Sequence, residues 1–181
     1  MSCHRPAPKP TRWRFSARSP INPIDNPSGA SELRFAVAIH EAGHAIAFAS
    51  VGIDVLSMWI GPEPNPSGRT QSGEIIAASR SDYLATIYAG DLAVDELCGG
   101  YRLPVVQSAA SDQEQLRRSE LELGITDDER TRAQARARQI VRAQCERVVA
   151  LANALLSAPD GRLLGADLDD QLAHVRTQFT A

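Results

Sequence analysis

The stretch 33–49 constrains this chain most, because it is almost entirely apolar and yet contains His40, Glu41 and His44. It has no proline and only one glycine, Gly43, so we expect it to form a buried helix. Residues four apart share one face of a helix, and His40 and His44 should therefore point the same way from successive turns. Polar side chains are costly in so apolar a helix unless something satisfies them, and a metal ion would do so.

These polar residues belong to a motif of the form HExxH, His40-Glu41-Ala42-Gly43-His44. The two imidazoles could occupy two of the four tetrahedral positions of zinc, and Glu41 could reach a water molecule on the metal. The alternative is a pair of buried histidines that hydrogen-bond inside a core. The apolar setting favours the zinc site.

Composition limits the class of protein. The chain has 181 residues, 43% of them apolar, which suits one domain with a sizeable core and a tail. No stretch approaches the roughly 18–20 consecutive apolar residues of a membrane span, and the basic N-terminus lacks the apolar region of a secretory signal. Cys3, Cys98 and Cys145 are an odd number without paired spacing. We therefore expect a cytoplasmic protein without a membrane span, a disulfide framework or a Cys-rich metal cluster.

Residues 1–30 are predicted to be a flexible tail, and residues 31–181 a single domain. The segment 1–24 is rich in proline and carries basic residues but no acidic ones. Such a segment buries too little apolar surface to become ordered. A basic tail could contact nucleic acid or an acidic partner. A solvated arm is the favoured interpretation, and we do not expect nucleic-acid binding.

Periodicity and capping signals predict a mainly α fold (α+β), with a small sheet of two or three strands beside the HExxH helix. Ser111 with Glu114, and Thr126 with Glu129, have the spacing of capping boxes. The first box would put Asp112 in the first turn of its helix. Helices are expected over 32–51, from Ser79 or Ser81 to 98, and over 111–124, 126–157 and 166–177, and strands over 54–60 and 73–77.

A zinc ion that keeps one position for water needs a third protein ligand. His4 and His174 have no partner at ligand spacing and are expected to be ordinary surface histidines. The remaining candidates are four carboxylates, those of Asp82, Asp95, Glu96 and Asp112. An acid at the start of a helix is held ionised by backbone N–H groups, but this suits a ligand and a plain first-turn acid equally. Residue chemistry alone leaves the choice open.

Several segments resemble the FtsH-type zinc metalloproteases, the peptidase part of membrane ATP-dependent proteases. His40–Ala45 resembles the active-site helix of that family, and Ala89–Leu97 is similar to its small-residue helix that ends in paired acids. Ala110–Gln115 is similar to the segment whose aspartate is the third zinc ligand. The segment 155–168 resembles the closing helix–turn–helix. The resemblance spans roughly residues 31–175 and implies a helical zinc-metallopeptidase domain.

The resemblance implies that His40, His44 and Asp112 bind zinc, with Asp112 preferred over Glu96. It further implies a metalloendopeptidase that hydrolyses peptide bonds of unfolded or flexible polypeptides. In such an enzyme a zinc-activated water attacks the carbonyl, with Glu41 as the general base. We also expect the strand at 55–60 to pair with extended substrate, and ordinary sheet packing is an equal alternative.

The chain departs from the family pattern in two places. It has no Gly-x-x-x-x-Gly-Lys-Ser/Thr phosphate loop, so we expect an ATP-independent hydrolase or one served by a separate ATP-dependent unfoldase. Asp91 stands where the family usually has arginine. The family forms hexameric rings that depend partly on the motor, so the oligomeric state stays open, with a homo-oligomer as one alternative. Two other functions remain as alternatives: a catalytically idle, zinc-stabilised interaction module, and a stand-alone HExxH peptidase that cleaves a repressor.

Overall fold

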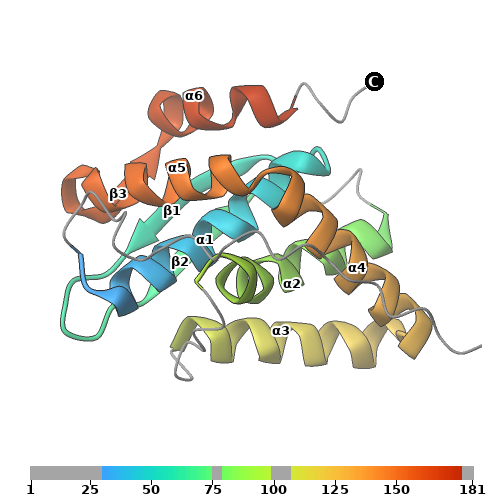
Figure 1. Cartoon of the computed structure of the whole chain (residues 1–181). Helices are drawn as coiled ribbons and strands as arrows, with labels where there is room; N and C mark the ends of the chain where they lie inside the picture. Colours follow the sequence, from blue (N-terminus) through green and yellow to red (C-terminus); the bar gives the residue numbers. More distant parts are fainter. Residues whose placement is uncertain (1–29, 75–78, 99–106, 177–181) are drawn as a thin grey trace, which may run out of the picture.

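A computed structural model of the chain describes residues 30–74, 79–98 and 107–176. Within these ranges six α-helices pack with a small antiparallel sheet of three strands (Figure 1), which confirms the mainly helical fold. The predicted tail lies outside the described residues, apart from Ala30. No helix in the described ranges is long and apolar enough to cross a membrane.

Helix α1 (Glu32–Ser50) is the central element of the fold (Figure 1). The Ser31 hydroxyl accepts a hydrogen bond from the Arg34 amide and caps its start, and Gly52, with a φ of 79°, follows its end. Helices α2 and α5 and the sheet all pack against it. Its side chains are consequently buried on nearly every face, as the apolar sequence predicts.

Helix α2 (Arg80–Leu97) packs between α1 and α4 (Asp127–Ala143). The contact between α1 and α2 is unusually close at Gly43. A Cβ atom at that position would lie 2.7 Å from both the Ala89 carbonyl oxygen and the Ala93 Cβ. Because Gly43 and the alanines are small, the backbone of α2 comes next to the histidine-bearing turn of α1.

The sheet has the strand order β2-β1-β3, with both pairs antiparallel. Strand β1 (Val55–Ile60) lies near its predicted position, and β3 is Arg162–Leu164. The second strand was predicted at 73–77, and that prediction is wrong for the described part, because β2 is Gly68–Ser72 and residues 73 and 74 lie outside it. The sequence of β2 is polar, with Thr70 as its one β-branched residue and no aromatic residue, so it gives little strand signal. Backbone pairing with β1 holds it in place instead.

The predicted single helix over 126–157 is two helices. Gln144 has φ −116° and ψ 18°, and it separates α4 from α5 (Cys145–Ser157). The two parts have different partners, since α4 packs mainly on α2 and α5 mainly on α1. A straight helix would satisfy only one of these contacts. After α5, a 3₁₀ turn (Pro159–Gly161) leads into β3 and α6 (Gly165–Arg176).

Helix α3 (Gln107–Leu123) begins earlier than predicted. Ser111 therefore lies inside the helix, and the predicted capping box with Glu114 is wrong. The Glu114 carboxylate instead accepts hydrogen bonds from Arg117 and Arg118. Asp112 accordingly lies beyond the first turn of α3, whereas the second predicted box, Thr126 with Glu129, is present.

Candidate metal centre

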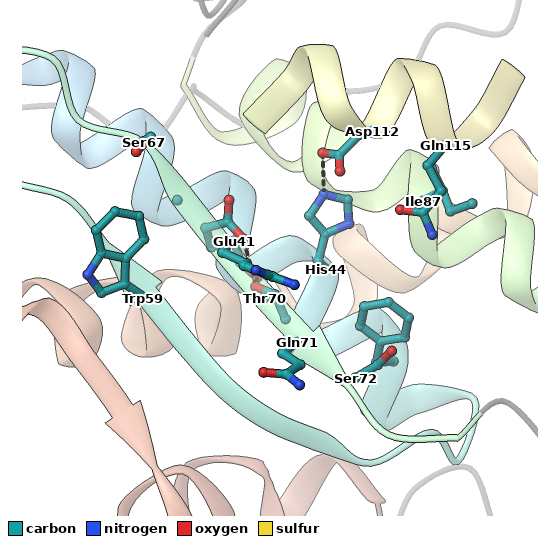
Figure 2. Close-up of a pocket in the computed structure, with 13 residues that line it drawn as sticks. Glu41, His44, Trp59, Ser67, Thr70, Gln71, Ser72, Ile87, Asp112 and Gln115 are labelled. Carbon is teal, nitrogen blue, oxygen red and sulfur yellow. Dashed lines mark hydrogen bonds and ion pairs between the residues drawn. The ribbon is translucent and has the colours of Figure 1, made fainter. Parts of the chain in front are cut away.

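Three side-chain atoms meet where α1 faces α3. The Asp112 Oδ2 atom lies 2.8 Å from His40 Nε2 and 3.1 Å from His44 Nε2, and the two nitrogens are 3.0 Å apart. Both histidines are buried, and Figure 2 shows Asp112 directed at the His44 ring from α3. The structure thus brings together all three residues that the sequence analysis selected as metal ligands.

A contact at Nδ1, the ring nitrogen of His44 that does not face Asp112, fixes the orientation of the ring. Its Nδ1 lies 2.7 Å from the Thr86 carbonyl oxygen on α2, and a carbonyl oxygen only accepts hydrogen bonds. Nδ1 must therefore carry the proton, and a neutral His44 presents a lone pair at Nε2. That lone pair faces the Asp112 carboxylate, which also carries lone pairs. Two such groups at 3.1 Å favour a cation between them.

The charges of His40 and Asp112 are strongly coupled. Burial alone would lower the pKa of His40, but the carboxylates of Asp112 and Asp91 outweigh it and raise the pKa to about 10. Burial also acts to raise the pKa of Asp112, and the hydrogen bond from the protonated His40 overcomes this and holds the pKa well below its usual value. Without a metal, a protonated His40 therefore balances an ionised Asp112.

The three donor atoms fit one zinc ion. Donors that share zinc lie roughly 3.3 Å apart, because Zn–N and Zn–O bonds are about 2.0–2.2 Å long in a tetrahedral site. The observed separations of 2.8 to 3.1 Å require only a small expansion. Space for the rings depends on Gly90 of α2, where a Cβ atom would lie 2.8 Å from His40 Cε1 and from His44 Cδ2. Two imidazoles and a carboxylate are a donor set typical of zinc.

Glu41 projects beside this group and toward the sheet. It is only 2% exposed, and burial, opposed by the nearby histidines and by Thr70, raises its pKa. The Thr70 hydroxyl lies 2.8 Å from Glu41 Oε2 and donates to it from β2. The carboxylate fits because the neighbouring strand residue is Gly68, whose Cβ would otherwise lie 2.5 Å from the Glu41 side chain. A raised pKa and a single donor are suited to a group that exchanges protons.

A cavity of about 620 Å³ opens over Glu41, His44 and Asp112. Strand β2 forms one wall, as Figure 2 shows, and the apolar side chains of Phe48 and Ile87 contribute to the lining. Trp59 also borders this cavity and is only partly buried. The site is therefore open to a ligand much larger than water.

Of the two equal alternatives for the strand at 55–60, substrate pairing and ordinary sheet packing, the structure shows sheet packing. Strand β1 is the middle strand, and over Ser57–Trp59 it pairs with β2 on one side and with β3 on the other, so it offers no open edge there. Strand β2 is an edge strand, and within the described ranges β1 is the only strand that pairs with it. Strand β3 is the other edge strand, but of these two only β2 contributes residues to the lining of the cavity, so the edge beside the cavity belongs to β2.

The other candidate ligands lie away from this cluster or have other partners. Glu96 accepts hydrogen bonds from Arg138 and Arg142 and ties α2 to α4, so it is no part of the donor group. Asp82 bonds to Ser79 at the start of α2. Asp95 and His174 are exposed, and His4 lies outside the described residues. The preference for Asp112 over Glu96 agrees with these positions.

Thr70, Thr86, Gly68 and Gly90 contribute to the site and were not identified by the sequence analysis. Thr70 was overlooked because its polar segment gave little strand signal. Thr86 acts through its backbone carbonyl oxygen, which no side-chain pattern reveals. Gly90 did carry a signal, since a glycine inside a helix costs about 1 kcal/mol relative to alanine.

No protein-family model and no curated protein matches this chain. The resemblance to the FtsH-type peptidases therefore rests on the motif segments alone, and membership of that family stays a prediction.

Proposed function

We propose that this protein is a zinc-dependent metallopeptidase of the HExxH type. The observation that carries the proposal is the convergence of His40, His44 and Asp112 on one point beside the buried carboxylate of Glu41, at the floor of an open cavity. A purely structural metal site is normally closed and has no use for a neighbouring base. The open cavity and Glu41 support a catalytic site.

His40, His44 and Asp112 would hold the ion. Zinc in this position would supply a Lewis acid that lowers the pKa of water to about 7 and polarises a peptide carbonyl. Glu41 takes the proton of the attacking water and returns it to the leaving amine. Its raised pKa brings it closer to the operating pH than an ordinary glutamate, and the Thr70 hydroxyl keeps its carboxylate directed into the site.

The proposed substrate is an unfolded or flexible polypeptide. Within the described residues the outer edge of β2 is unpaired and borders the cavity, and an extended peptide could pair with it through main-chain hydrogen bonds. Such pairing needs an extended backbone, which a folded substrate does not offer. The sequence also predicts that a separate ATP-dependent unfoldase could supply such chains. A cytoplasmic location is likewise still a prediction from the sequence.

The test is hydrolysis of casein or of an unstructured fluorogenic peptide by zinc-loaded protein. The Glu41→Gln variant should retain zinc and lose roughly 10²–10⁴-fold in turnover, the usual contribution of a general base. Glu32→Gln is the matched control, because Glu32 is an exposed acid in the first turn of the same helix. This control should keep both zinc and activity.

The outcomes separate the alternatives. Zinc-loaded wild type that is as inert as Glu41→Gln would contradict the peptidase and favour the idle interaction module. A wild type that retains no zinc when purified with excess metal would contradict the metal centre itself. Cleavage of one folded repressor, without cleavage of unstructured chains, would favour the stand-alone repressor peptidase.

A further inference from the structure

We propose that Asp91 is a positioning residue of the metal centre, whose carboxylate accepts the Nδ1 proton of His40 and so directs the Nε2 lone pair of that ring at the metal. The inference rests on the proposed metal centre and goes beyond its three ligands. Asp91 entered the sequence analysis only as a departure from the family pattern.

The two ring edges of His40 have different neighbours. Nε2 faces Asp112 at 2.8 Å, whereas Nδ1 is buried and has no hydrogen-bond partner at normal distance. The nearest acceptor recorded for it is Asp91 Oδ1, at 3.4 Å. That separation is an electrostatic contact, a few tenths of an ångström longer than a hydrogen bond. A buried imidazole N–H has a strong need for an acceptor, and a small side-chain rotation of Asp91 would supply it.

The same helix positions both histidines. Thr86 of α2 accepts from His44 Nδ1, and Asp91, just over one turn further along α2, faces His40 Nδ1. Gly90 lies between them and leaves the room that the rings occupy. Metal-binding histidines usually donate their second ring N–H to a carbonyl or a carboxylate, which fixes the tautomer and raises the basicity of the ligand nitrogen. Here α2 offers one acceptor of each kind.

The Asp91 side chain is 55% exposed, and among the described residues His40 is its only ion-pair partner. Asp95 lies one turn further along the same helix and is also exposed, but makes no recorded contact with the site. These two acids therefore differ mainly in their relation to His40, which makes Asp95 a matched control.

The experiment measures the dissociation constant for zinc of the full chain, by competition with a chromophoric chelator. Asp91→Ala should weaken zinc binding by about 10–100-fold, the usual effect of losing such a partner. Asp91→Asn keeps an acceptor oxygen without the charge and should fall between wild type and Asp91→Ala. Asp95→Ala should bind zinc within about twofold of wild type, because it removes an equivalent charge at a distance. Far-UV circular dichroism checks that each variant is folded.

The spectroscopic readout is the ¹⁵N resonance of His40 Nδ1 in the zinc-loaded protein, which should move in Asp91→Ala and stay in Asp95→Ala. Equal zinc affinities for Asp91→Ala and Asp95→Ala, with an unmoved His40 resonance, would overturn the inference while leaving the metal centre intact. If wild type itself binds no zinc, the proposed function fails, and this result is distinguishable from the first.

Discussion

The Thr70 hydroxyl lies 2.8 Å from Glu41 Oε2 and 3.0 Å from the Glu41 carbonyl oxygen. One residue of the edge strand β2 thus contacts both the side chain and the backbone of the proposed base on α1. The HExxH helix and the sheet are joined at the position where the chemistry is proposed to occur. Since Thr70 donates to the carboxylate, it stabilises the ionised form of Glu41.

Thr70→Val should shift the acidic limb of the kcat/KM profile to higher pH. Burial already raises the pKa of Glu41, and Thr70 opposes that rise, so its loss should raise the pKa further. The base works only when ionised, and activity should therefore be lost at a higher pH as the solution is acidified. A hydrogen bond to a charged group contributes roughly 1.5–3 kcal/mol, which corresponds to about one pKa unit or more. Ser72→Ala removes a hydroxyl elsewhere on β2 and is the control. An unshifted profile in Thr70→Val would contradict the role of this contact.

Asp112→Ala should lose zinc, whereas Glu96→Gln should keep zinc and lower the folding stability. Asp112→Ala removes a proposed ligand and should strip zinc at concentrations that saturate wild type, as measured by metal analysis after dialysis. Glu96→Gln should keep zinc, because Glu96 lies outside the donor group. Retention of zinc by Asp112→Ala together with its loss from Glu96→Gln would reverse the assignment.

The effect of Glu96→Gln should appear in folding stability instead. Glu96 is largely buried and accepts from Arg138 and Arg142 on α4. Both arginines are partly exposed, so solvent screens the pairs and the expected loss is about 1 kcal/mol or less. Urea unfolding of the metal-free protein measures it. An unchanged free energy of unfolding would mean that the three side chains contribute nothing to the α2–α4 contact.

Sequence reasoning placed His40 and His44 together because their signal is local. The spacing of His40 and His44 on an apolar helix already fixes their common face. The elements that failed are those whose form depends on partners distant in the sequence. Strand β2 exists because β1 is next to it, and the break at Gln144 exists because α4 and α5 pack on different helices. Neither the pairing of β2 with β1 nor the different packing partners of α4 and α5 can be read from the residues of these segments alone.

Asp112 lies between the features predicted from local signals and those that depend on distant partners. Its place in the site was inferred from resemblance and not from its own helix, whose start was predicted too late. The error did not affect the expected position of Asp112 beside the histidines, because an aspartate inside a helix reaches them as well as one in its first turn would. Orientation of the rings was beyond sequence reasoning altogether, since it depends on the Thr86 carbonyl oxygen and on the space at Gly90.

Gly90→Ala should lower both zinc affinity and stability. Alanine normally stabilises a helix interior relative to glycine, by roughly 0.5–1 kcal/mol. Here the added methyl group would meet the His40 and His44 rings, and overpacking of this kind costs about 1–3 kcal/mol. The sign of the change in melting temperature therefore shows whether the gain in helix propensity or the overpacking against the rings is larger. Gly73→Ala is the control, because its Cβ would have only ordinary contacts, at 3.5 Å or more. A more stable Gly90→Ala variant with unchanged zinc affinity would contradict the packing argument.

Zinc binding near neutral pH should release about one proton from the protein. The carboxylates of Asp112 and Asp91 outweigh burial and raise the pKa of His40 to about 10 in the metal-free state, so the ring is protonated. A metal ligand must present a lone pair, and zinc therefore has to displace that proton, whereas Asp112 is already ionised.

Apparent zinc affinity should consequently rise about tenfold for each pH unit while the pH stays below the pKa of His40. Isothermal titration calorimetry in buffers of different ionisation enthalpy measures the released protons directly. Asp112→Asn should release fewer protons, because the Asp91 carboxylate alone stabilises the protonated His40 ring less strongly. A smaller proton release in this variant would identify His40 as the source of the proton. Binding heats that are independent of the buffer would mean that the His40 ring is already neutral before zinc binds. They would contradict the coupling between Asp112 and His40 that we infer from their 2.8 Å contact.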